Sequence, residues 1–116
     1  MITIPYPPSV NMYWRMAVIG GRPRMLLSRE ARQYKERVEI ILRAKALKPL
    51  QGAVRLRATV YRPARRGDLD NTLKALLDAL RGHLYDDDSQ VAEIHVKRAE
   101  DKVNPRVELE VTSLEG

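Results

Sequence analysis

The stretch VRLRATVYRPARRGDLDNTLKALLDALR, residues 54–81, decides the fold because its hydrophobic periodicity changes once along its length. From Val54 to Tyr61 apolar and polar residues alternate, which is the period of a half-buried strand, and Pro63 ends it. After the proline, leucines recur at helical spacing and predict a helix from about Asp70 to Arg81. The apolar stripe of this helix is Leu69, Leu73, Leu76, Leu77 and Leu80, and Gly82 is placed to cap its C-terminus.

The segments on either side supply further strands and a second helix. Met1 to Pro5 predicts a short strand, and two semi-apolar runs around Gly20-Gly21 predict a hairpin or a flexible loop. Ser28 is the expected N-cap of an amphipathic helix that Lys48-Pro49 closes. Alternating residues at 92–97 and 107–111 predict the last strands. We therefore expect one domain over residues 1–116 of the α+β class, a single mixed β-sheet packed with two α-helices.

The composition excludes several kinds of functional site and indicates the kind of partner. The chain has no cysteine, which excludes disulfides, thiolate zinc sites and cysteine nucleophiles. The formal net charge is +6 and the pI about 9.9, so an anionic polymer is the natural partner. No apolar run approaches the roughly 18 residues of a membrane span, and the N-terminal segment lacks the apolar centre of a signal peptide. We expect a cytoplasmic protein with no membrane partner and no small-molecule cofactor.

Two acidic segments stand out in this basic chain: Asp68-Leu69-Asp70-Asn71 and Asp86-Asp87-Asp88-Ser89-Gln90. Carboxylates two residues apart at a loop-to-helix junction can face one small ion, and hard oxygen ligands suit Mg²⁺ or Mn²⁺. A third carboxylate must come from elsewhere, and Asp88, at the mouth of the next strand, is the natural supplier. A metal held in this way would activate water against a phosphodiester, and Lys74, one helical turn after Asp70, would stabilise the phosphate charge.

Arginines lead into the first acidic segment. Five of them lie within twelve residues and form either a phosphate-binding track or an ordinary solvent-exposed face, two interpretations that we weigh equally. They are Arg55, Arg57, Arg62, Arg65 and Arg66.

In combination these residues resemble the RusA family of Holliday junction resolvases. The resemblance rests on Asp68-Leu69-Asp70-Asn71, on Lys74, Asp78 and Leu80, and on Asp87-Asp88-Ser89-Gln90-Val91, in that order. The N-terminal Pro5-Tyr6-Pro7-Pro8-Ser9 with Asn11 and Tyr13-Trp14-Arg15 also resembles that family, as do Lys97 and Pro105-Arg106-Val107, so nearly the whole chain is covered.

The resemblance implies a homodimer that binds branched DNA at a four-way junction and makes paired nicks with Mg²⁺. Carried over by position, Asp68, Asp70 and Asp88 become the metal-binding catalytic carboxylates and Lys74 the essential lysine, and alignment on Ser89-Gln90-Val91 favours Asp88 over Asp87. Gly67 departs from the pattern, because another basic residue is expected before the first aspartate. The expected DNA-binding residues are Arg15, Arg62, Arg65, Arg66 and Lys74.

Other interpretations of the same residues are open. Asp70 could be a helix N-cap, the run Asp86 to Asp88 a solvated turn, and Lys74 an ion-pair partner of Asp70 and Asp78. A non-catalytic junction-binding module is the main alternative to an enzyme. The run 68–72 also matches the D-x-D-x-T motif of haloacid-dehalogenase-type phosphatases, but the arginine-rich segment before it is not a buried apolar strand.

Overall fold

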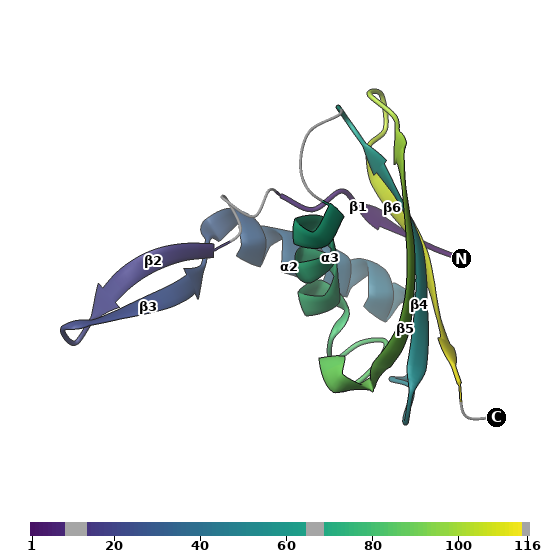
Figure 1. Ribbon diagram of the computed structural model, residues 1–116, viewed down its shortest axis with the longest axis horizontal. Coiled ribbons are helices and arrows are strands. Elements are labelled where there is room, and N and C mark those ends of the chain that lie inside the picture. The colour runs from purple at the N-terminus through teal and green to yellow at the C-terminus, as the bar shows by residue number, and fades with distance from the viewer. Residues whose placement is uncertain (9–13, 65–68, 115–116) are drawn as a thin grey trace.

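A computed structural model describes residues 1–8, 14–64 and 69–114, without the side chains of residues 14–17, 25 and 69–71 (Figure 1). The strands are β1 (Ile2–Pro5), β2 (Trp14–Ile19), β3 (Arg22–Leu27), β4 (Val54–Arg62), β5 (Val91–Glu100) and β6 (Arg106–Ser113). The helices are α2 (Arg29–Ala44) and α3 (Leu69–Leu80), with a short 3₁₀ helix, η1, at Asp88–Gln90.

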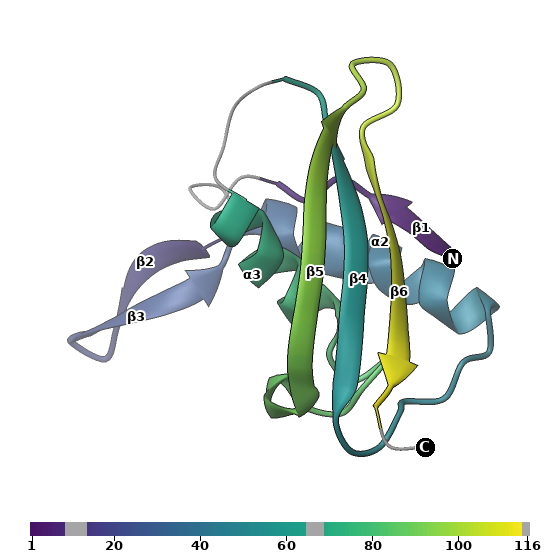
Figure 2. The same ribbon diagram turned by 45° about the vertical axis from the view of Figure 1, so that its right-hand side comes forward.

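The main sheet has four strands in the order β1-β6-β4-β5. The pair β4 and β5 is parallel, while β4 with β6 and β1 with β6 are antiparallel, which confirms the predicted mixed sheet. Both α2 and α3 lie on the same face of this sheet (Figures 1 and 2). The α+β prediction, with a mixed sheet and two helices, is therefore confirmed, but the expected single sheet is wrong because β2 and β3 form a second sheet of their own.

Alternation along β4 sends its even-numbered side chains to the core beneath the helices. Val54, Leu56 and Val60 are at most 1 % exposed, while the odd-numbered Arg55 and Arg57 lie on the opposite face. The helices contribute the rest of the core through Ala31, Tyr34, Val38 and Leu42 of α2 and Ala75, Leu76, Ala79 and Leu80 of α3. The period change seen in the sequence thus matches the surfaces that are buried.

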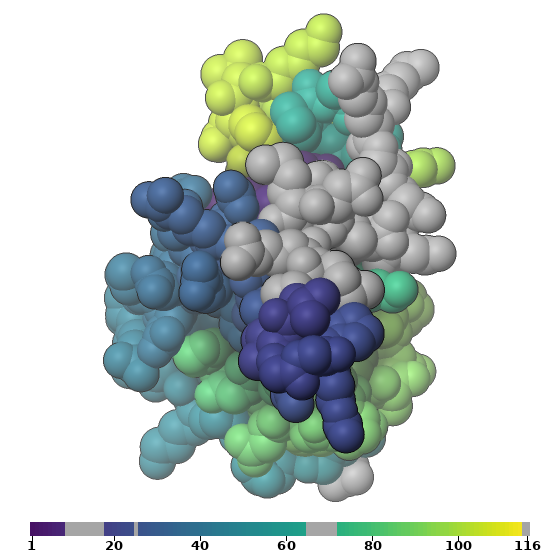
Figure 3. Space-filling model, turned by 90° about the vertical axis from the view of Figure 1, so that its left-hand side faces the viewer, coloured from purple at the N-terminus to yellow at the C-terminus, as the bar shows by residue number. Residues whose placement is uncertain are grey.

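Strands β2 and β3 form a separate two-stranded antiparallel hairpin that projects from the body (Figure 1). Ile19 pairs with Arg22, and the two intervening glycines have φ values of 60° and 77°, a conformation that glycine adopts at little cost. Of the two predicted alternatives, a hairpin or a flexible loop, the structure has the hairpin. Figure 3 views it end-on, in front of the body.

Helix boundaries agree with the prediction at three of the four ends. Ser28 caps α2 as expected, with its Oγ accepting a hydrogen bond from the Ala31 amide at 3.1 Å. The C-terminus of α2 was predicted wrongly, because the helix stops at Ala44, before Lys48-Pro49, and Ala46 takes a left-handed φ of 53°. Gly82, with a φ of 85°, follows α3 as predicted. No helix in the described part of the chain is both long and apolar enough to cross a membrane.

Candidate active site

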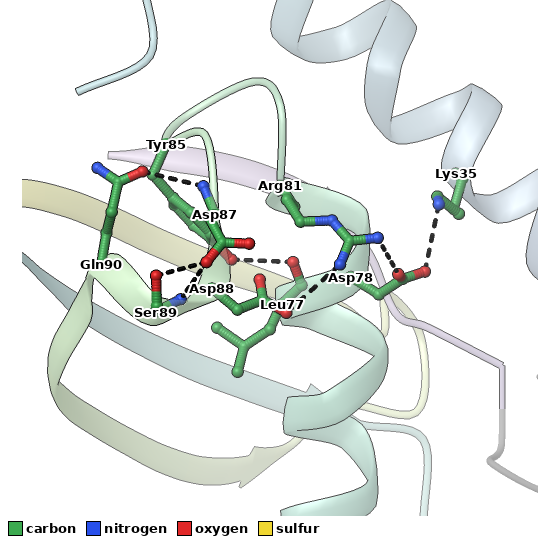
Figure 4. A network of polar contacts seen from close by, with 9 residues as sticks. All are labelled: Lys35, Leu77, Asp78, Arg81, Tyr85, Asp87, Asp88, Ser89 and Gln90. Atoms are coloured by element: carbon green, nitrogen blue, oxygen red, sulfur yellow. Dashed lines mark hydrogen bonds and ion pairs between the residues drawn. The ribbon is translucent and has the colours of Figure 1, made fainter. Parts of the chain in front are cut away.

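Helix α3 carries the candidate residues Asp70 and Lys74. Asp70 lies in the first turn of the helix, but its side chain and the whole of Asp68 are outside the described residues. Lys74 is exposed and forms no ion pair with any described residue. Its proposed partner Asp78 instead contacts the ammonium of Lys35 and the guanidinium of Arg81, each at 3.3 Å (Figure 4). An exposed ammonium on this helix is available to an external anion.

Asp88, the first residue of η1, places its two carboxylate oxygens in different surroundings (Figure 4). Oδ2 lies 3.8 Å from Nη1 of Arg81, a long ion pair between half-exposed side chains. Oδ1 is buried and has no hydrogen-bond partner among the described residues. An ionised oxygen without a partner is costly to bury, and a bound cation is one way to offset that cost.

Asp87 has a different task, which is to build the turn that presents Asp88. Its carboxylate accepts hydrogen bonds from the amide of Ser89, at 3.1 Å, and from the Ser89 hydroxyl, and these bonds lower the pKa of Asp87. In return, Oε1 of Gln90 accepts from the amides of Asp86 and Asp87 at 2.8 and 2.9 Å. Asp87 is thus occupied as the N-cap of η1, in a capping box with Gln90.

The remaining contacts tie this turn to the body. The side-chain amide of Gln90 donates to the carbonyls of Leu50 and Gly52 at 2.8 and 2.9 Å. Gln51 donates through Nε2 to the carboxylate of Asp86 at 2.9 Å. The three consecutive aspartates therefore separate by role, because the first two accept hydrogen bonds from protein groups and the third keeps a buried oxygen without one.

Tyr85 is a neighbour of Asp88 that the sequence analysis did not single out. It is fully buried, and its hydroxyl donates to the Leu77 carbonyl of α3 at 2.9 Å. Burial raises the pKa of Tyr85, and the negative charge of Asp88 and the polar contact with its carboxylate raise it further, so the phenol stays protonated. Its single proton is donated to the Leu77 carbonyl and not to Asp88. The one signal in the sequence was an aromatic residue immediately before the acidic run.

The backbone of Asp70 and the turn that holds Asp88 lie near opposite ends of α3. Asp88 lies near the C-terminal end of the helix, because it pairs with Arg81. Its neighbour Tyr85 donates to the carbonyl of Leu77. Asp70 precedes Leu77 by seven residues, which is about 10 Å along the axis of an α-helix. Residues whose side chains the structure describes include no group of three His, Cys, Asp or Glu placed to hold a metal ion. The three-carboxylate site stays a prediction, since it depends on side chains beyond the described part.

The predicted DNA-binding arginines do not form one described surface. The Arg62 side chain is 11 % exposed at the end of β4, with Nη2 4.0 Å from a Glu100 oxygen, which leaves little of it for a phosphate. Arg55 and Arg57 lie on the face of the sheet away from the helices. Arg65 and Arg66 and the side chain of Arg15 are outside the described residues. Alternation along β4 therefore places the three described arginines of the run on two faces of the sheet.

Comparison with known proteins decides the family. The family model described as endodeoxyribonuclease RusA matches residues 5–112, a span that contains both acidic segments. The chain belongs to the RusA family. This confirms the resemblance and argues against the haloacid-dehalogenase-type interpretation of residues 68–72.

Three relatives show how far the RusA similarity extends. The chain is 35 % identical to the crossover junction endodeoxyribonuclease of Enterobacteria phage 82 over 116 residues, which is 97 % of this chain and 93 % of the relative. The protein of the same name from phage HK97 is 34 % identical with the same coverage. The RusA protein of Escherichia coli K12 is 35 % identical, also over 97 % and 93 % of the two chains.

Proposed function

We propose that this RusA-family chain is a homodimeric endodeoxyribonuclease that resolves four-way DNA junctions with Mg²⁺. The observation that carries the proposal is the family match over residues 5–112, together with relatives named crossover junction endodeoxyribonucleases. A net charge of +6 suits a DNA substrate. The site of action would be the DNA of the nucleoid, in the cytoplasm.

Asp68, Asp70 and Asp88 are the proposed metal ligands. Carboxylate oxygens suit Mg²⁺, with Mn²⁺ as the expected substitute, and the buried oxygen of Asp88 without a hydrogen-bond partner fits a cation ligand. The bound metal would supply an activated water and polarise the phosphodiester. Asp87 would act on this site indirectly, because as the cap of η1 it fixes where the carboxylate of Asp88 lies.

Basic residues would position the DNA. Lys74 is exposed on α3 and is proposed to contact the phosphate that is cut, where a positive charge stabilises the charge developing in the transition state. Arg15, Arg65 and Arg66 are proposed to bind flanking phosphates, with a smaller share for Arg62. Two such sites in a symmetric dimer would match the two strands that must be cut in a four-way junction.

A cleavage assay with three substrates tests this function. The chain is incubated with a synthetic four-way junction, a linear duplex and a small phosphomonoester, each with and without Mg²⁺. We expect efficient cutting of the junction alone, in the presence of the metal, and an Asp70→Asn variant that binds the junction but does not cut it. Tight junction binding without cleavage in Mg²⁺ or Mn²⁺ would instead support the non-catalytic binding module.

Metal binding can be measured by thermal unfolding, without a cleavage assay. Mg²⁺ should raise the melting temperature of the wild-type chain, and the variants are informative because the backbone of Asp70 is at one end of α3 while Asp88 pairs with Arg81 just beyond the other end. If the three carboxylates share one ion, Asp70→Asn and Asp88→Asn each remove the same Mg²⁺-dependent stabilisation. If each variant leaves that stabilisation in place, a shared site is excluded.

A further inference from the structure

One edge of the main sheet is β5, a long strand whose outer side pairs with no described strand. Strand β5 pairs with β4 along one side and ends the order β1-β6-β4-β5, so its other side has no partner among the described strands (Figure 2). It is ten residues long and contains no proline or glycine. Exposed edges of this kind present unpaired amides and carbonyls that can pair with another chain.

An apolar side chain on the inner face marks the same edge. Ile94 is level with Leu56 of β4 and shares its face, yet Leu56 is fully buried and Ile94 is 41 % exposed. Ile94 lies on the edge strand β5, and no described element covers the outer side of that strand. Val96, level with Ala58, is partly buried on the same face. A strand added beside β5 would cover both side chains.

The charges of β5 are complementary to those of a second, inverted copy of the same strand. Glu93 and Lys97 lie on one face, four residues apart, which separates them by about 13 Å along a strand, too far for an ion pair within the chain. In an antiparallel pair with a twofold axis at His95, Glu93 lies opposite Lys97 of the second copy, and the reverse pair forms as well. The same register sets Ile94 opposite Val96.

Neighbouring registers lose this match. An axis at Val96 sets Lys97 opposite His95 and leaves it without a carboxylate partner. An axis at Ile94 sets Lys97 opposite the apolar Val91. Opposite charges across a strand pair stabilise it, so the register centred on His95, which alone of the three sets Glu93 opposite Lys97, is favoured.

We propose that a second copy of this chain pairs antiparallel with β5 about a twofold axis at His95. This inference rests on the proposed homodimer and names its interface. Glu93 would keep its contact within the chain, because the Nε of Arg55 donates to Oε2 at 2.5 Å and the carboxylate has a second oxygen for Lys97 of the other copy. The result is one continuous sheet that runs through both subunits.

Charge reversal at the two positions, followed by mixing, tests the interface. In Glu93→Lys each strand presents two lysines to its partner, and in Lys97→Glu it presents two glutamates. We expect each variant alone to raise the dimer dissociation constant by at least about tenfold, measured by analytical ultracentrifugation, because two opposed pairs become repulsive. An equimolar mixture restores both ion pairs between unlike chains, so differently tagged variants should form heterodimers detectable by native mass spectrometry.

The controls separate this proposal from folding and from the nuclease function. Lys102→Glu makes the same charge change at an exposed residue beyond β5 and should leave dimerisation unchanged. Circular dichroism checks that Glu93→Lys, which also loses the Arg55 contact, is folded. A monomeric wild-type chain, wild-type dimerisation in both variants, or a mixture without heterodimers would overturn the interface. Junction cleavage, measured on the wild-type chain, succeeds or fails independently of these outcomes.

Discussion

Asparagine substitutions at Asp87 and Asp88 should distinguish a residue that caps η1 from a residue that takes part in cleavage. Both changes remove one negative charge from adjacent positions, but the two carboxylates lie in different surroundings. Asp87 caps η1, whereas Asp88 has a buried oxygen without a described hydrogen-bond partner. We expect Asp88→Asn to lose junction cleavage and Asp87→Asn to keep it.

The contacts of Asp87 and Asp88 set the expected changes in stability and in cleavage rate. The described ion pair of Asp88 is the half-exposed contact with Arg81 at 3.8 Å, and such pairs contribute at most about 1 kcal/mol, so Asp88→Asn should change the free energy of unfolding by less than that. Loss of a metal ligand should slow cleavage at least about 100-fold, which corresponds to roughly 2.7 kcal/mol in the activation free energy. Asparagine still caps a helix, whereas Asp87→Ala removes the acceptor and should lower Tm by about 3 °C.

Single-turnover cleavage of a four-way junction in Mg²⁺ gives the rates, and thermal unfolding gives the stabilities. The predicted pattern is a stable but inactive Asp88→Asn, an active Asp87→Asn, and an Asp87→Ala that is less stable and loses part of its activity, because the turn that presents Asp88 is no longer capped. The reasoning is refuted if Asp88→Asn keeps more than a tenth of the wild-type rate while Asp87→Asn falls below that level.

Three further predictions concern the lysine, the metal and acid stability. Lys74→Ala should lower the cleavage rate about 100-fold with no change in Tm, because the side chain is exposed; Lys102→Ala is the control, and a wild-type rate would exclude Lys74 from catalysis. Replacing Mg²⁺ with Ca²⁺ should preserve junction binding in a gel-shift assay and give little product, because the larger shell positions water poorly; rapid cutting in Ca²⁺ would contradict this. Asp101 accepts from the amides of Val103 and Asn104 and from Arg106, which lowers its pKa, so its stabilisation is full above the unfolded pKa and lost as the pH falls. Asp101→Asn should therefore have a lower Tm than wild type at pH 7, and the difference should close below about pH 4; a difference that persists at pH 2 would exclude the carboxylate charge as its cause.

The elements of the fold were predictable because burial leaves a period in the sequence. The alternation around Leu56 and the leucines of α3 predicted a strand and a helix, and both bury those side chains. The end of α2 was not predictable from the apolar pattern, because it depends on the left-handed backbone of Ala46, a residue with no special preference for that conformation. Local periodicity reports which face is buried but not where a backbone turns.

The candidate site was predictable as a set of residue types and less so as an arrangement. Three consecutive aspartates carry nearly the same local signal, and alignment on the following residues favoured Asp88. Their different roles come from the local capping box of Asp87 with Gln90 and from Arg81 and Tyr85 beside Asp88. The one group distant in sequence is the Leu50 carbonyl, which accepts a hydrogen bond from Gln90. The arginine-rich run was predicted without reference to faces, and the alternation of β4 places its described arginines on two sides of the sheet.

The sequence by itself determined the family, the α+β composition and the residue types available for chemistry, because these depend on local pattern and on motifs in a fixed order. The tertiary structure decided which strand ends the sheet, which aspartate caps η1 and which keeps a buried oxygen without a described hydrogen-bond partner. The physical reason is that strand order and burial are set by contacts between segments far apart in the chain. Residues such as Ile94 and Leu56 have the same local preference, and their exposure differs because one strand is central and the other is at the edge.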